Sequence, residues 1–240
     1  LHAWIEFGNR LLTFVLLITA LAAVIFSIKY SKNVLNKTRI RTLALLQVLG
    51  ILGQGVLGGI TVLTDLHPLP VAGHFLLSIF LISGAISLRY ELVGVVREEA
   101  VGILKPILPL LIWLTLFVLI AGTIVTGSGP HAGDEQAKRF GFDPRFVSWL
   151  HADLVIALLV LTGMLFLITR QSQLKVINKR IGLFLLICLA QGLVGYVQYF
   201  TGLPVVLVAI HLLGATLVWV SAWSLIKVAD SGFKLKGFHL

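Results

Sequence analysis

The amino-acid sequence predicts an all-α integral membrane protein of two pseudo-symmetric four-helix transmembrane bundles, with seven of the spans in this chain. Of 240 residues, 58% are hydrophobic and only 12% are charged, and the mean hydropathy is +1.01. A soluble domain of this length cannot bury so much apolar surface. Seven apolar runs are long enough to cross a bilayer, and a pattern in the early runs recurs in the late ones.

A spanning helix needs about 20 mostly apolar residues. The predicted spans are residues 5–28, 43–64, 69–88, 106–126, 147–169, 181–200 and 204–226. Lys and Arg gather in the connections after the first, third and fifth spans and in the C-terminal tail. These segments are therefore predicted to be cytoplasmic, in a multi-pass protein of the plasma membrane. The same distribution explains the formal net charge of +9, so we expect a lipid bilayer and no nucleic acid as partner.

A repeat divides the chain into two halves. "QGVLGG" begins at Gln54 and "QGLVGY" at Gln191, and each glutamine precedes a histidine, His74 or His211, by 20 residues across a Pro-containing turn. The predicted domains are an N-terminal bundle, 1–94, and a C-terminal bundle, 95–240. The first bundle is one helix short, and we expect that helix before Leu1.

The intramembrane histidines are the candidate iron ligands. His74, His151 and His211 are each predicted to lie roughly 5–12 Å inside the outer boundary of the membrane. Two neutral imidazoles that face each other across a bundle core are axial ligands of a six-coordinate haem, which is the prediction for His151 and His211. Gly195 and Gly214 leave room for a flat macrocycle. The alternative is that the histidines only form hydrogen bonds between helices.

The first bundle differs in its ligands. His74 corresponds to His211, but Asn9 stands where His151 stands in the second bundle. Glu6 lies almost one helical turn before Asn9, and a carboxylate at the edge of the hydrocarbon is costly and therefore a functional candidate. Either Glu6 pairs with Arg10, or it handles protons beside a haem. This asymmetry suits electron storage in one bundle and reaction in the other.

The long outer loop supplies further candidates. His131 and Arg139 are cations that suit haem propionates, although a solvated connector is the alternative. The candidate cofactor-binding residues are His74, Asn9, Arg10, His131, Arg139, Gln54 and Gln191.

Several segments together resemble a known family. "WIEFGNRLLT", "PVAGHFLLS", "GTIVTGSGPHAGD", "SWLHADLVIALL" and "VAIHLLGATL" are similar to the haem A synthase (cytochrome oxidase assembly) family, particularly its actinobacterial branch, over nearly the whole chain. The resemblance implies eight helices in two bundles, with His151 and His211 ligating a resident haem b. It also implies that His74 ligates haem O as substrate and that Glu6 is catalytic. Asn9 departs from the family pattern, which has a histidine there.

The reaction implied by the resemblance is oxidation of the C8 methyl group of haem O to a formyl group, which yields haem A for cytochrome c oxidase. Haem O synthase, oxidase assembly proteins and a second copy of the chain are then expected partners. Two alternatives remain. One is a diheme b-type electron carrier that does not modify haem, and the other is an assembly factor that only delivers haem, which Glu6 disfavours.

Overall fold

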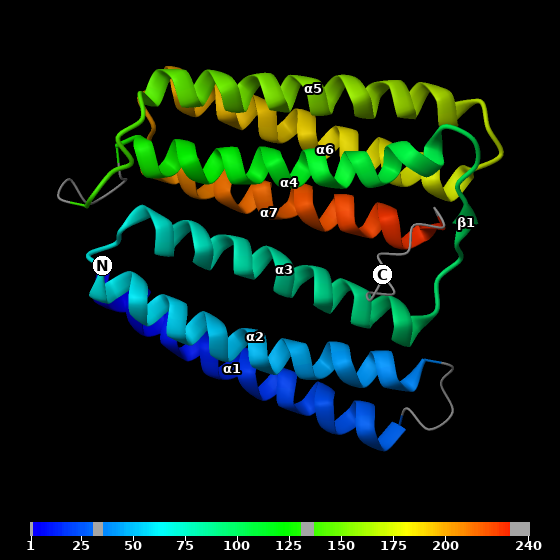
Figure 1. Ribbon diagram of the computed structural model, residues 1–240, viewed down its shortest axis with the longest axis horizontal. Coiled ribbons are helices and arrows are strands. Elements are labelled where there is room, and N and C mark those ends of the chain that lie inside the picture. Colours follow the sequence, from blue (N-terminus) through cyan, green and yellow to red (C-terminus); the bar gives the residue numbers. More distant parts are fainter. Residues whose placement is uncertain (1, 31–35, 131–136, 231–240) are drawn as a thin grey trace. The chain divides into compact units, whose positions relative to one another are not determined.

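The computed structural model describes residues 2–30, 36–130 and 137–230, with only the backbone for residues 2–6, 9, 10 and 30. The helices are α1 (His2–Tyr30), α2 (Lys37–Leu63), α3 (Pro68–Val93), α4 (Leu104–Ser128), α5 (Pro144–Arg170), α6 (Lys175–Phe200) and α7 (Val205–Val228) (Figure 1). Two short strands are β1 (Glu98–Glu99) and β2 (Ala229–Asp230). Within these residues, all seven helices are long and apolar enough to cross a membrane. The predicted all-α membrane fold is confirmed.

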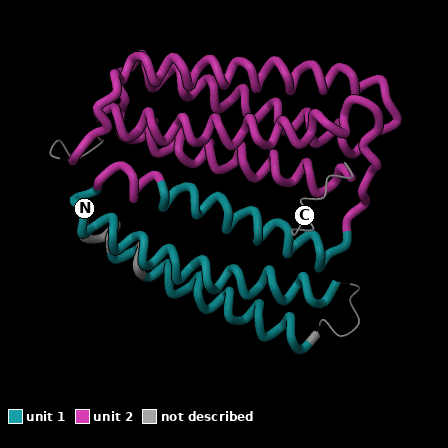
Figure 2. The backbone as a smooth tube through the Cα atoms, viewed as in Figure 1, with its two compact units in different colours: residues 1–66, 73–94 teal, residues 67–72, 95–240 magenta. Residues whose placement is uncertain are grey.

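The chain forms two compact units (Figure 2). Unit 1 comprises residues 1–66 and 73–94 and contains α1, α2 and most of α3. Unit 2 comprises residues 67–72 and 95–240 and contains α4 to α7. Each unit is a bundle of helices that alternate in direction, because short connections join them.

Unit 2 closes on itself, since α4 packs against α5 and α7, and α6 packs against α5 and α7. Its core is apolar, and because lipid is as apolar as these side chains, close van der Waals packing holds the helices together. Fully buried core side chains include Leu108, Leu111, Leu158, Leu165, Ile181 and Phe184. The buried hydroxyl groups of Thr115, Thr162 and Thr169 each donate to the carbonyl four residues earlier, so none is left unsatisfied.

Unit 2 also carries a small parallel strand pair, in which Glu98 lies opposite Ala229 and Glu99 opposite Asp230. The Glu98 carboxylate accepts hydrogen bonds from the backbone N–H groups of Val176 (3.0 Å) and Ile177 (2.9 Å) in the first turn of α6. The start of a helix carries unpaired N–H groups and a partial positive charge, so this carboxylate stabilises it. The sequence did not predict this strand pair.

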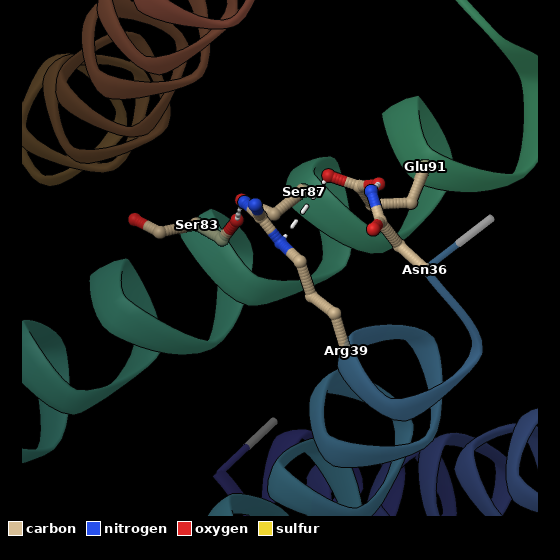
Figure 3. A network of polar contacts seen from close by, with 5 residues as sticks. All are labelled: Asn36, Arg39, Ser83, Ser87 and Glu91. Atoms are coloured by element: carbon tan, nitrogen blue, oxygen red, sulfur yellow. Dashed lines mark hydrogen bonds and ion pairs between the residues drawn. The ribbon is translucent and has the colours of Figure 1, made fainter. Parts of the chain in front are cut away.

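Unit 1 has a polar contact between α2 and α3. Arg39 Nε lies 3.2 Å from a carboxylate oxygen of Glu91, and the Asn36 side-chain amide donates to the other oxygen over 3.2 Å. Figure 3 shows the Arg39 side chain extending along α3 beside Ser83 and Ser87. The Glu91 side chain is only 8% exposed, so this ion pair is well shielded and holds α2 to α3 there.

Each unit has two ends. We call the end at which α2 turns into α3, and in unit 2 the end at which α4 connects to α5 and α6 turns into α7, the histidine end. We call the opposite end, where Arg39 and Glu98 lie, the basic end. At the histidine end, the tight turns at residues 64–67 and 201–204 have the same backbone structure. Asp65 and Leu66 have φ of 51° and 58°, and Gly202 and Leu203 have φ of 77° and 61°.

The hydrogen bonds of the two turns also correspond. The N–H of Leu66 donates to the carbonyl of Thr61 (2.9 Å), and the N–H of Leu203 donates to the carbonyl of Gln198 (2.8 Å). The repeat seen in the sequence is therefore present in the backbone of the two turns.

Candidate functional site

Three histidines lie at matched depths near the histidine ends. His74 is on α3, His151 on α5 and His211 on α7, each six or seven residues after the start of its helix. At 1.5 Å per residue this corresponds to about 9–11 Å along the helix. In unit 2, His151 and His211 lie on α5 and α7 at the same end of the bundle, and their pairing across it stays a prediction.

A glutamine on the preceding helix holds the backbone of two of these histidines. The Gln54 side-chain amide donates to the carbonyl of His74 (3.0 Å) and to the hydroxyl oxygen of Ser78 (2.6 Å). The Gln191 amide donates to the carbonyl of His211 (2.6 Å). The 20-residue spacing found in the sequence therefore corresponds to a contact in each unit. The contact fixes the helix that carries the histidine, not the imidazole ring itself.

A glycine on a neighbouring helix lies against the Cε1 atom of each imidazole. A Cβ atom placed on Gly58 would lie 3.5 Å from Cε1 of His74, and one on Gly195 would lie 3.1 Å from Cε1 of His211. On α4, a Cβ atom on Gly122 would lie 3.4 Å from Cε1 of His151. The bare backbone at these positions lets each ring sit between the helices.

One nitrogen of each imidazole is not satisfied by the protein. The Nδ1 atoms of His74, His151 and His211 are buried and have no hydrogen-bond partner among the described residues. Buried polar atoms nearly always have a partner, and an orphaned one calls for an explanation such as a bound group. Three such atoms in equivalent surroundings point to ligation.

The metal-ligating side chains near the imidazoles limit which kind of group could bind there. Within the described part of the chain, no three His, Cys, Asp or Glu side chains gather as a site for a metal ion. A metal held by these imidazoles must therefore bring most of its own ligands, as the iron of a haem does, for which the protein supplies only the axial positions. The residues present fit a haem in unit 2. In unit 1 they fit a haem with one protein ligand, His74.

Sequence reasoning missed Gly122 and Gln198. The Oε1 atom of Gln198 is buried without a partner among the described residues. Gln191, Gly195 and Gln198 follow one another at helical spacing on one face of α6, so the same polar stripe extends to the histidine end. That spacing was the available signal for Gln198. Gly122 had none, because it is identified only by packing between α4 and α5.

The remaining candidates are only partly placed. Arg139 is half-buried in the connection between α4 and α5 and has interactions of its own. Glu6, Asn9 and Arg10 belong to the first turns of α1, but their side chains lie outside the described part of the structure. His131 also lies outside the described residues. The roles assigned to these four residues therefore stay predictions.

Fold and site together define a class: a multi-pass helical membrane protein that presents buried, unpartnered imidazole nitrogens near one end of each unit. The family model of the cytochrome oxidase assembly proteins, COX15-CtaA, matches residues 1–223, and the chain belongs to this family. The resemblance seen in the sequence is confirmed, and it gives the protein a role in cytochrome oxidase assembly and haem A synthesis. No curated protein and no solved structure matches the chain.

Proposed function

We propose that the protein is a haem A synthase that oxidises the C8 methyl group of haem O to a formyl group, producing haem A for cytochrome c oxidase. The observation that carries this proposal is the repeated site, in which an imidazole with an unpartnered Nδ1 lies against a glycine and is anchored through its backbone by a glutamine in both units. Two such sites in a chain of the oxidase assembly family suit a resident haem and a haem substrate.

The two units have different tasks in this proposal. His151 and His211 would hold a haem b in unit 2, and that group would supply one-electron redox chemistry. His74 holds the substrate haem O in unit 1, where Asn9 replaces the second histidine. Haem O synthase supplies the substrate, and oxidase assembly proteins receive the product.

Glu6 is the proposed catalytic residue. Conversion of a methyl to a formyl group is an oxidation that breaks C–H bonds and takes up one oxygen atom from water or dioxygen. It needs an external oxidant to accept the electrons and an acid–base group nearby to accept the protons. Glu6 lies on the first turns of α1, at the histidine end of unit 1. A carboxylate at the membrane boundary, next to bulk water, is suited to accept these protons and pass them on. By the distribution of Lys and Arg, this end is the extracytoplasmic one in the plasma membrane.

The test uses the full-length protein expressed in a host that makes haem O. After purification, its haems are extracted and identified by chromatography and mass spectrometry. Haem B together with haem O, its hydroxylated form or haem A is the expected result. Haem B alone would contradict the proposal and favour the diheme electron carrier.

Variants separate the two sites. We expect His211→Ala to lose haem B, because one axial ligand of the resident haem is removed. We expect Glu6→Gln to keep its haem content and to lower haem A formation by about a hundredfold or more, as for loss of a general base. Glu99→Gln, at the exposed basic end beside Lys105, is the matched control and should change neither property. Normal haem A formation by Glu6→Gln would remove Glu6 from the catalytic role.

A further inference from the structure

We propose that one position of the repeat, Leu77 in unit 1 and Gly214 in unit 2, determines how long each unit retains its tetrapyrrole. Leu77 allows the tetrapyrrole of unit 1 to exchange. Gly214 lets α6 and α7 pack closely beside the tetrapyrrole that unit 2 retains. Both are positioning residues that act through the spacing of two helices. The inference rests on the proposed function, because it takes both histidine sites as haem sites.

The two positions are equivalent in the repeat. Leu77 follows His74 by three residues, and Gly214 follows His211 by three. Gly58 and Gly195, which lie against the two imidazoles, also correspond to each other in the repeat. The change from glycine to leucine lies beside two smaller differences, Gly53 in place of Ala190 and Ser78 in place of Ala215.

In unit 2, the missing side chain of Gly214 is what admits Gln191. The Gln191 side chain lies in the space that a Cβ atom on Gly214 would need. From there its amide reaches the carbonyl of His211 over 2.6 Å. The Cα atoms of α6 and α7 approach each other within 8 Å along the pair. Two glycines, Gly195 and Gly214, thus bring the backbones together at the imidazole.

In unit 1, Leu77 fills the corresponding space. Its Cδ2 atom lies 3.6 Å from the position of a Cβ atom on Gly53, an ordinary van der Waals contact. Gln54 divides its amide between the hydroxyl oxygen of Ser78 and the carbonyl of His74, and the second bond is 3.0 Å long. Among the described residues, α2 and α3 pack much more loosely than α6 and α7.

Side chains connect this helix pair away from His74. Towards the basic end, the side chain of Leu81 lies over Gly50 and that of Gln47 lies over Gly84, in each case where a Cβ atom would be. Beyond them, Arg39 and Glu91 form their ion pair. Side chains and an ion pair therefore connect α2 and α3 towards the basic end, and the side chain of Leu77 lies between them next to His74.

This difference has a kinetic consequence. A flat macrocycle leaves a bundle only if the helices beside it separate, so its rate of release depends on how closely they pack. Differences in affinity between related sites are mostly differences in this rate. A substrate must be exchanged after each reaction, whereas a redox group must stay. The loose packing of α2 against α3 suits exchange, and the close packing of α6 against α7 suits retention.

Reciprocal variants of the full-length protein test the proposal. The site of unit 2 is isolated by His74→Ala, and that of unit 1 by His151→Ala together with His211→Ala. Each protein is loaded with haem B, and transfer of haem to excess apomyoglobin is followed by absorbance. We expect slower release from unit 2 than from unit 1.

We expect Gly214→Leu to accelerate release from unit 2 by about tenfold or more, as overpacking of a tight interface does. Leu77→Gly should slow release from unit 1, a gain that general damage to the fold does not produce. Gly163→Leu and Leu52→Gly are the controls, because Gly163 has open space around it and Leu52 is exposed. Both controls should leave the rates unchanged.

Equal release rates from the two units, or reciprocal variants that leave the rates unchanged, would overturn the proposal. If Gly214→Leu does not fold, Gly214→Ala replaces it, since one methyl group already displaces Gln191 and should accelerate release to a smaller extent. The measurement uses haem B transfer and no turnover. A protein that forms no haem A but shows the reciprocal effect contradicts only the proposed function, and one that forms haem A without the effect contradicts only this inference.

Discussion

The three intramembrane histidines have closely similar surroundings. Each imidazole has a glycine against Cε1 and an unpartnered Nδ1, and two of the three are carried on helices held by a glutamine. The glutamine bonds are partly buried, which limits the access of an alternative partner such as water. They therefore act on the position of the ligand-bearing helix, and loss of one should weaken the site without abolishing it.

Gln191→Ala tests this at the residue scale. Removing the amide leaves the carbonyl of His211 with only its helical partner, and a lost hydrogen bond of this kind costs about 1 kcal/mol. We expect haem still to bind, with an affinity lowered by about five- to tenfold. Titration of the purified apoprotein with haem B measures the change. Gln173→Ala, exposed in the connection between α5 and α6, is the control. Unchanged affinity in Gln191→Ala would show that the glutamine does not position the ligand.

At this scale, the sequence identified His74, His211 and their glutamines because the same spacing occurs twice. It also identified His151, because a histidine inside an apolar run is conspicuous. It did not identify Gly122 or Gln198. Contacts across non-repeated helix pairs depend on the rotation of each helix about its axis, and hydropathy does not fix that rotation in a lipid environment where all faces are apolar.

At the scale of elements, all seven helices occur where apolar runs predicted them, but most are longer. α2 begins at Lys37 and α6 at Lys175, several residues before the apolar runs. Lys and Arg near a membrane boundary lay their aliphatic stems along the apolar surface, so a helix continues past the hydrocarbon edge. The strand pair was missed because two-residue strands carry no periodicity.

The start of α5 sets the position of His151 and depends on Asp143. The Asp143 carboxylate accepts from the N–H groups of Arg145 (2.7 Å) and Phe146 (3.0 Å), and Pro144 occupies the first helical position. We expect Asp143→Ala to destabilise the protein by about 1 kcal/mol. Thermal unfolding in detergent, monitored by circular dichroism and by the haem absorbance, should show a lower midpoint. Asp153→Ala, an exposed carboxylate on the same helix, is the control. An unchanged midpoint in Asp143→Ala would mean that α5 starts without this cap.

At the scale of the whole molecule, the orientation in the membrane decides on which side the haem chemistry takes place. The connections that carry Lys and Arg are those of the basic end, and the histidine ends have few such residues within the described part of the chain. From the positive-inside rule we expect the basic end in the cytoplasm. The chain also offers a convenient background for labelling, because its one cysteine, Cys188, is only 2% exposed.

Labelling of single introduced cysteines measures the orientation. In intact cells, we expect a membrane-impermeant maleimide to react with Thr201→Cys, which lies in the exposed turn between α6 and α7. Gln173→Cys, in the connection between α5 and α6, should react only after the membrane is permeabilised. The unaltered chain is the control and should remain unlabelled. The opposite order of labelling would invert the orientation and place the histidine ends in the cytoplasm.

The bond from glutamine to the histidine carbonyl also bears on how such a protein evolves. Gln54 and Gln191 recognise the main chain at residues 74 and 211, and the main-chain carbonyl is the same whichever side chain that residue carries. After duplication of an ancestral bundle, a mutation that removes an iron ligand leaves this fastening in place. Each copy can then lose or exchange single ligands while remaining folded. Two copies of one cofactor-binding bundle can in this way diverge into an electron-transfer site and a substrate site.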